Sequence, residues 1–330
     1  MGTDGTSSTR QTRKRSARPA PPQALRRRGR VLAGVAAAVA AGVTGAALPA
    51  SADGGDDPGR TFLATSLNGA DEVPVPGGPA VGDRDGSALE FVKVEGDRVS
   101  VAVRWRGTGA PTMLHLHEGA KGTNGGVRID FGPLLAKARH HRVTGTVTVG
   151  DSALLGRLTS DPGGFYADLH TAAFPGGAVR GRLHRVTTPF DIRHALDGFQ
   201  ASVVRGQQIY ACRKDPATGV SAFAQRDVRA VLGHDIAHSF VAPNSGVPQW
   251  VAPDGSAVTG TVLGKTPNGE HNIAELDLKA TSSGKHHGLL ARTAEILRLN
   301  TVGGVAPAGS CAEGAIVGVP YRADYVFVQR

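Results

Sequence analysis

The feature of this sequence that most constrains its fold is an alternation of apolar and polar residues with a period of two. At residues 99–105 the odd positions are apolar and the even positions are small or charged, and residues 142–149 repeat this rhythm. Such alternation is typical of a half-buried β-strand. Clusters of turn-forming residues separate these runs, at 75–79, 122–126, 161–164 and 175–177. Many short strands separated by turns predict an all-β protein built as an antiparallel sandwich or barrel.

The strand-like pattern continues in the second half of the chain, at residues 207–212, 257–263, 295–300 and 319–328. In the last of these runs four residues share one face: Tyr321, Ala323, Tyr325 and Phe327. Helical periodicity is scarce, and residues 133–140 are the best candidate for a short helix because proline stands at its first position. A weak boundary near residues 187–195 divides the pattern. We therefore predict two antiparallel β-sandwich-like domains, at 61–186 and 199–330, joined by a linker at 187–198.

The first 52 residues differ in composition from the rest. Residues 31–49 are apolar and uncharged, follow an arginine cluster at 26–30, and precede the small residues 50–52. This order predicts a cleaved secretory signal peptide at 1–52, followed by a short polar linker at 53–60. The alternative is an uncleaved membrane anchor, because about 18 apolar residues can span a bilayer. The weakly hydrophobic Ala, Gly and Val content and the small-residue cleavage site favour cleavage, with no stable membrane span afterwards.

The formal net charge of +9 is concentrated in the predicted signal peptide. Residues 1–52 hold nine Lys or Arg and one acid, Asp4, so 28 basic and 27 acidic residues remain beyond them. The remainder is nearly neutral, and the basic total therefore does not indicate a nucleic-acid partner. We expect a secreted or extracellular protein, with cell-wall association left open. Either the general secretory or the twin-arginine route would suit the leader, and the expected partner is an unidentified cell-envelope or extracellular ligand.

The chain contains two cysteines, Cys212 and Cys311. In an oxidising compartment an even pair predicts one disulfide, here closing a loop of about a hundred residues. A bridge of that span stabilises a fold by roughly 4–5 kcal/mol in the chain-entropy model. A reactive thiol or a metal site is the less favoured alternative, because neither cysteine has a close Cys or His neighbour in the sequence.

Three strand-like segments, at 114–119, 166–171 and 179–184, carry chemically active side chains on one face. The cofacial sets are His115 with His117; Tyr166 with Asp168 and His170; and Arg180 with Arg182 and His184. Residues two apart on a strand are separated by roughly 6–7 Å. Two imidazoles at that spacing can converge on one metal ion, or they can make separate hydrogen bonds.

These segments carry spaced motifs in a fixed order: His-x-His-x-Gly with a following Asn124–Gly125 turn, then Tyr-x-x-x-His-Thr, then Pro-Gly-x-x-x-Arg-Gly. Residues 61–185 thereby resemble the CHRD domain, named from chordin and common in secreted bacterial proteins. The resemblance implies an immunoglobulin-type β-sandwich whose His-x-His strand is similar to that of copper–zinc superoxide dismutase. The family usually carries Asn at position 168, Glu at 178 and Gln at 182. Since the acid at 178 is absent here, we expect Asp168 to replace it as a partner of Arg180.

Two interpretations of the histidine-bearing face remain open. In the favoured one, the polar side chains form a hydrogen-bond network that locks neighbouring strands; its candidate members are His115, His117, Asn124, Tyr166, Asp168, His170 and Arg180. In the other, His115, His117 and His170 bind copper or zinc, metals that imidazole suits. A full dismutase site would need a bridging histidine and a second metal cluster, which spacing does not identify. No catalytic residue can be assigned.

The second half carries the motifs Gln-Ile-Tyr-x-Cys at 208–212 and Asn-Thr-x-Gly-Gly-x-x-Pro at 300–307. Residues 199–329 are similar to a bacterial domain-of-unknown-function family found in exported proteins, which implies fold and export but no chemistry. Trp250 stands close to an Asp-Gly-Ser turn at 254–256. It can form a ligand-facing rim, since exposed tryptophan suits sugars or peptides, or it can be part of the core, which we favour.

The sequence therefore favours an exported, non-enzymatic binding or cell-envelope interaction protein without a cofactor. The alternative from another class is a copper- or zinc-binding protein with a dismutase-like site on the His-x-His strand. A hydrolase in the second domain is a further alternative, for which no nucleophile–base pair can be named.

Overall fold

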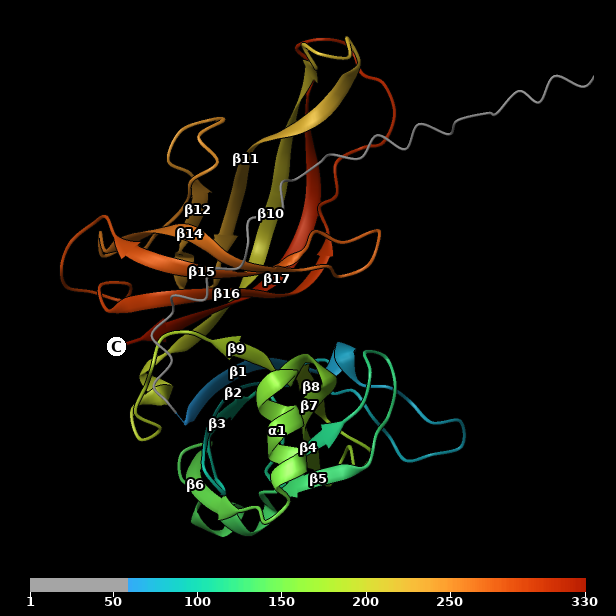
Figure 1. The fold of residues 1–330 in the computed structure, drawn as a ribbon, viewed down its shortest axis with the longest axis vertical. Helices are drawn as coiled ribbons and strands as arrows, with labels where there is room; N and C mark the ends of the chain where they lie inside the picture. The colour runs from blue at the N-terminus through green and yellow to red at the C-terminus, as the bar shows by residue number, and fades with distance from the viewer. Residues whose placement is uncertain (1–58) are drawn as a thin grey trace, which may run out of the picture. The chain divides into compact units, whose positions relative to one another are not determined.

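Antiparallel strands make up most of residues 59–330, the part of the chain that the computed structural model describes (Figure 1). The predicted signal peptide and residues 53–58 of the predicted linker lie outside the described residues. The one described α-helix is α1 (Ser152–Ser160), and short 3₁₀ turns account for the other helical segments of residues 59–330. Nowhere in that range is a helix both long and apolar enough to cross a membrane. The all-β prediction is confirmed.

The first nine strands form one antiparallel sheet. Its order is β5-β4-β7-β8-β1-β2-β3-β6, and β9 also pairs with β1. The bounds are β1 (Arg60–Asn68), β2 (Ser87–Glu95), β3 (Arg98–Arg106), β4 (Pro111–Glu118), β5 (Val127–Asp130), β6 (Arg142–Thr148), β7 (Phe165–Thr171), β8 (Val179–Arg182) and β9 (His184–Val186).

The core of this sheet explains its period-two sequence. Alternate residues of the strands enter a single apolar cluster, which includes Val99, Val101 and Val103 of β3. Leucines of α1 close the same cluster. The sheet therefore curls around its own core, against which α1 also packs, and this arrangement fits the predicted sandwich-like domain. The alternation of apolar and polar residues predicts which side chains are buried. A single curled sheet and two stacked sheets can both bury them.

Two short helices flank this core. Residues 132–137 form a 3₁₀ helix, η2 (Gly132–Lys137), with Pro133 in its first turn, so the prediction of a short helix there is confirmed. The α1 helix was not predicted. Its signals are Asp151, whose carboxylate accepts a hydrogen bond from the Leu154 N–H at 2.9 Å, and leucines three and four residues apart.

The remaining strands close into an eight-stranded antiparallel barrel in chain order, and the last strand pairs with the first. The strands are β10 (Phe199–Lys214), β11 (Ser221–Leu232), β12 (Ala237–Phe240), β13 (Pro248–Val251), β14 (Ala257–Thr266), β15 (Glu275–Ser282), β16 (Thr293–Gly303) and β17 (Ile316–Gln329). The face predicted for β17 is confirmed, because Tyr321, Ala323, Tyr325 and Phe327 all enter the barrel core. Closure removes the exposed sheet edges that a sandwich would keep.

A third apolar cluster contains side chains from the curled sheet, the barrel and the segment between them. That segment was expected to be a linker, but Phe190 packs its ring against Phe62 and Phe91, with centroid distances of 4.9 and 5.2 Å. The Glu295 carboxylate of β16 accepts hydrogen bonds from the Thr187 N–H and hydroxyl, both at 2.9 Å. The segment is therefore an ordered part of the packing.

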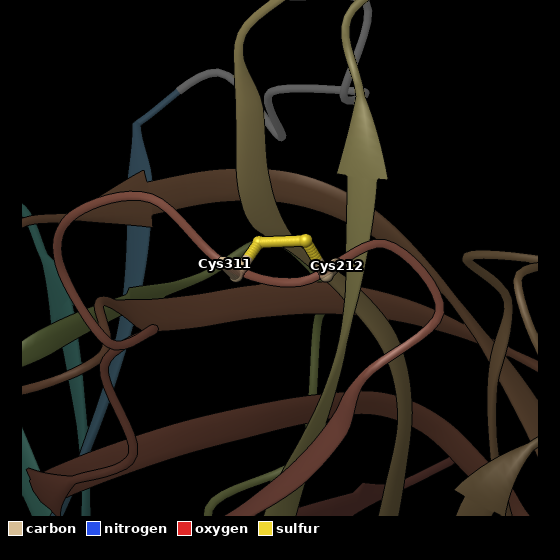
Figure 2. The surroundings of a disulfide bond; sticks show 2 residues. All are labelled: Cys212 and Cys311. Atoms are coloured by element: carbon tan, nitrogen blue, oxygen red, sulfur yellow. A yellow bond between two sulfur atoms is a disulfide. The ribbon is translucent and has the colours of Figure 1, made fainter.

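The predicted disulfide is present between Cys212 on β10 and Cys311 in the segment before β17 (Figure 2). The two Cα atoms lie 5.8 Å apart, and the bond joins positions separated by 99 residues. It ties the loop between β16 and β17 to β10, the strand with which β17 pairs to close the barrel.

Removing this bridge should destabilise the barrel. We expect the double variant Cys212→Ser/Cys311→Ser to lose roughly 2–5 kcal/mol in the free energy of unfolding, because the reduced unfolded chain regains loop entropy. Denaturant titration of the variant and of the oxidised wild type measures the difference. Wild type under reducing conditions is the matched control and should shift by a similar amount; equal midpoints in all three samples would contradict the prediction.

Glu90 is a charged residue type in the core of the curled sheet. It lies on β2 between Ala88 and Val92, which both belong to the sheet's apolar cluster, and its side chain is fully buried. Neither carboxyl oxygen has a hydrogen-bond partner. Burial raises the pKa of Glu90 from 4.5 to about 8, so the folded protein holds this group as the neutral acid at physiological pH.

This gives a pH dependence with a defined sign. Between pH 4.5 and about 8 the unfolded chain loses the Glu90 proton while the folded chain keeps it, so stability falls as pH rises through this window and levels off above it. The total effect is roughly 4–5 kcal/mol at about 1.4 kcal/mol per pKa unit. Melting curves of Glu90→Gln should lack this decline, and the exposed-site control Glu313→Gln should retain it. A Glu90→Gln profile parallel to that of wild type would refute the assignment.

Candidate metal centre

The pairing of β4 with β7 brings the predicted polar faces together. The register places His115 opposite Asp168 and His117 opposite Tyr166, and His170 pairs with the residue two before His115. Side chains on directly paired positions point to the same face of a sheet. All five side chains therefore lie on the face opposite the apolar core, to which the intervening residues of both strands contribute.

Three imidazoles converge on this face. His115, His117 and His170 each offer one ring nitrogen, and these three atoms lie within 4.8 Å of one another. Each residue is only 8% exposed. The ring of His115 is central, with its centroid 5.5 Å from that of His117 and 5.3 Å from that of His170. Within residues 59–330, no other group of three His, Cys, Asp or Glu residues has this convergence.

The outer nitrogens of two imidazoles are fixed by backbone carbonyls. His117 Nδ1 lies 3.0 Å from the Gly125 carbonyl oxygen, and His170 Nδ1 lies 3.0 Å from that of Pro175. A carbonyl oxygen only accepts, so both Nδ1 atoms carry a proton, and in the neutral ring Nε2 is the nitrogen that offers a lone pair. These Nε2 atoms are buried without a hydrogen-bond partner. Metal-binding histidines commonly have this arrangement.

His115 uses the opposite nitrogen. Its Nε2 lies 3.5 Å from Asp130 Oδ1, and its Nδ1 is the buried atom without a partner. Burial lowers the pKa of both His115 and His117, with smaller contributions from neighbouring groups. The neutral imidazole that this favours is the form that ligates a metal ion.

Two carboxyl groups lie beside the histidines. Asp168 Oδ1 is 3.6 Å from His170 Nε2, and both Asp168 Oδ1 and Glu72 Oε1 are buried without hydrogen-bond partners. Burial, followed by the charge of Asp168, raises the pKa of Glu72 to about 9, and burial also raises the pKa of Asp168. Two adjacent buried carboxyls resist double ionisation, so Glu72 holds a proton at neutral pH and Asp168 is the anionic partner.

Arg180 organises the loop beside the cluster. Its guanidinium lies 3.4 Å from the centroid of the Tyr166 ring and donates to Asn124 Oδ1 at 2.8 Å and to the Thr123 carbonyl at 2.5 Å. The Tyr166 ring in turn stacks on His117, at 4.8 Å between centroids and 5° between planes. Ring contacts and hydrogen bonds thus connect Arg180, Tyr166 and the loop at 123–125 to His117, and they leave His117 Nε2 without a hydrogen-bond partner.

Arg180 lies directly opposite Asp168 in the pairing of β7 with β8, and its charge acts to lower the pKa of Asp168, while its hydrogen bonds go to the loop. A second acid beside this site was not predicted. Glu72 lies in the segment after the 3₁₀ turn η1 (Gly69–Asp71), and a Cβ on Gly177 would lie 2.6 Å from its Oε2. Its carboxyl group therefore lies against Gly177. Sequence periodicity could not identify Glu72, since it belongs to no strand.

Of the third predicted face, Arg180 lies beside the cluster, whereas Arg182 and His184 make their contacts elsewhere. The Arg182 guanidinium donates to the Gly163 carbonyl, and His184 Nε2 lies 3.6 Å from Glu275 Oε2 of the barrel. Asp130 was also missed, because its role depends on the pairing of β5 with β4, which places it opposite His115.

Trp250 lies far from this cluster in the chain and belongs to the barrel core. It is 1% exposed and stacks on His238, with centroids 4.5 Å apart and planes 4° apart. The burial of Trp250 supports its interpretation as a core residue. Trp250 does not form an exposed rim beside the turn at Asp254.

A curled antiparallel sheet with a buried histidine cluster, followed by a closed barrel, defines an all-β chain of two modules with one candidate metal centre. Residues 63–183 match the family model of the CHRD domain, and residues 220–329 match that of a protein of unknown function, DUF3455. The chain therefore carries a CHRD domain followed by a DUF3455 domain, and both resemblances are confirmed. No curated protein and no solved structure matches it. Every residue of the histidine cluster, with Glu72 and Asp168, lies within the CHRD match.

Proposed function

We propose that this protein is an exported metal-binding protein whose CHRD domain holds one copper or zinc ion through His115, His117 and His170. Two observations carry the proposal: one ring nitrogen from each histidine lies within 4.8 Å of the others, and each ring has one buried nitrogen without a hydrogen-bond partner. A hydrogen-bond network alone would not favour this arrangement, because each buried polar atom left unpaired costs roughly 1–3 kcal/mol. A bound cation would satisfy all three at once.

The donor set suits these metals. Neutral imidazoles bind zinc and copper well, and three histidines with one carboxylate are within the usual ligand range of zinc. Asp168 is a buried carboxylate 3.6 Å from His170 Nε2, and its unpartnered Oδ1 makes it the candidate fourth ligand. Glu72, protonated at neutral pH, would donate a hydrogen bond to Asp168 and fix its orientation.

Binding is favoured over dismutase-like catalysis. A dismutase site pairs two metal clusters through a bridging histidine, whereas residues 59–330 contain the one convergent group described above. The proposal therefore keeps a non-enzymatic role, in which the bound ion either stabilises the CHRD domain or forms part of a surface recognised by a cell-envelope or extracellular ligand.

Metal analysis tests the proposal. Purified protein dialysed against Zn²⁺ or Cu²⁺ should retain one ion per chain, measured by elemental mass spectrometry. Removing a direct ligand should weaken affinity by more than roughly 100-fold, since even outer-sphere partners contribute 10–100-fold. His117→Ala and His170→Ala should show this loss in competition with a chromophoric chelator. His286→Ala, at an exposed barrel site, should bind as wild type does.

Thermal denaturation separates lost binding from lost folding. The metal should raise the melting temperature of wild type and His286→Ala and leave that of the ligand variants unchanged, since only a ligand bound to the folded state stabilises it. Wild type that retains no stoichiometric ion would refute the proposal, as would a His117→Ala protein that binds with unchanged affinity.

Export is supported by the leader sequence and by the disulfide, which forms and persists in oxidising compartments. We expect protein recovered from the medium or the cell envelope to begin at Asp53, after cleavage at Ala52. Mass spectrometry of its amino-terminal peptide checks this. Recovery of the intact leader in the membrane fraction would favour the anchor alternative instead.

A further inference from the structure

The barrel is filled at one end and hollow beyond it. Phe199 and Phe327 stack at 4.7 Å between centroids and close the filled end. Beyond them lies a cavity of about 430 Å³ inside the barrel. Eight-stranded barrels are either packed with side chains or just wide enough to hold one small ligand, and this volume is within the range of small-molecule sites.

Apolar and polar side chains share the wall of this cavity in similar measure. Its apolar lining comes from strands on several sides of the barrel and includes Val228, Phe240, Trp250, Leu276, Leu278 and Tyr325. The lining also contains Lys265 and Glu270, which are exposed, so the cavity reaches the surface beside the end of β14. A ligand can therefore enter from solvent and place an apolar body against buried rings.

Two buried side chains of the lining have hydrogen-bond donors without partners. Gln208 and Trp250 are each 1% exposed, and Gln208 Nε2 and Trp250 Nε1 make no hydrogen bond. The other end of the Gln208 amide is occupied, because its Oε1 accepts from Gln225 Nε2 at 2.7 Å. The free polar atoms are thus donors, and a complementary ligand must supply acceptors.

Arg298 adds a positive charge to the same wall. It lies on β16 two residues after the core residue Ile296, and its Nε and Nη2 both donate to the Ala274 carbonyl, at 3.2 and 2.7 Å. No carboxylate of residues 59–330 forms an ion pair with it. A guanidinium beside apolar side chains is a suitable site for a carboxylate, because its N–H groups form charge-assisted hydrogen bonds with the carboxylate oxygens.

We propose that the barrel cavity binds a small amphipathic carboxylate, with its acid group on Arg298 and its apolar body along Trp250 and Leu278. The unpartnered N–H groups of Gln208 and Trp250 supply further donors to the ligand's oxygens. This site is separate from the histidine cluster, and it uses only residues of the barrel.

Octanoate is the probe, and octanol is its matched neutral control. The full mature chain carrying Trp105→Phe retains Trp250 as its single tryptophan, so its fluorescence reports on the cavity directly. Octanoate should bind saturably, change this fluorescence and bind at least tenfold more tightly than octanol, the minimum expected of a charge-assisted hydrogen bond in a buried site. Calorimetry with the unmodified chain should give the same affinity.

Two variants assign the binding to the proposed contacts. Arg298→Gln removes the charge, and Gln208→Glu keeps the acceptor used by Gln225 while replacing the free donor with an anion. Both should lose roughly tenfold or more in octanoate affinity while octanol affinity is unchanged. Arg322→Gln, an exposed charge change on β17, should behave as wild type. The proposal is overturned if octanoate causes no saturable change, if octanol binds equally well, or if Gln208→Glu binds octanoate normally.

Discussion

The register between β4 and β7 is the constraint on which the candidate metal centre depends. Because side chains alternate, one pairing sends the leucines and the alanine of these strands into the core and gathers the histidines on the opposite face. A slip of one residue in either strand would expose that strand's core residues and bury its imidazoles among apolar groups. Burial of the core therefore fixes the register, and the register fixes the position of the cluster.

The surrounding network then orients what the register brings together. Arg180 holds the loop through Asn124 and Thr123, and the Tyr166 hydroxyl accepts from the Gly125 N–H at 2.9 Å. These contacts place the Gly125 carbonyl where it accepts a hydrogen bond from His117 Nδ1. The sequence presents the network and a metal site as alternatives, but they are compatible, because the network determines which ring nitrogen of His117 would be available to a metal ion.

Local pattern predicted the strands, the faces of β4 and β17 and the disulfide, because each depends on neighbouring positions or on a single cysteine pair. It could not predict that each module curls or closes on itself, since the same alternation serves a sandwich and a barrel. Glu72 was missed for a related reason. Its position beside Gly177 depends on how a loop after β1 folds back over β8, and no periodicity encodes such long-range placement. Gln208 and Trp250 lie on regular strands, and only the closure of the barrel brings them to the wall of one cavity.

Unpartnered buried polar atoms link the two proposals. Among those of residues 59–330, five lie at the histidine cluster with its two acids and two on the wall of the barrel cavity; the others belong to Glu90, Trp105, Thr108 and Asp277. An isolated titratable group can avoid the cost of burying a charge by changing its protonation state, as Glu90 does by remaining neutral. Three imidazoles with free lone pairs cannot all do so, since protonating them would place several positive charges within 4.8 Å. The amide of Gln208 and the indole N–H of Trp250 cannot change protonation either, because these groups do not titrate. Where a change of protonation cannot remove the cost of an unpartnered atom, a bound partner can. A cation would accept the lone pairs at the histidine cluster, and an anion would accept the hydrogen bonds offered in the barrel cavity.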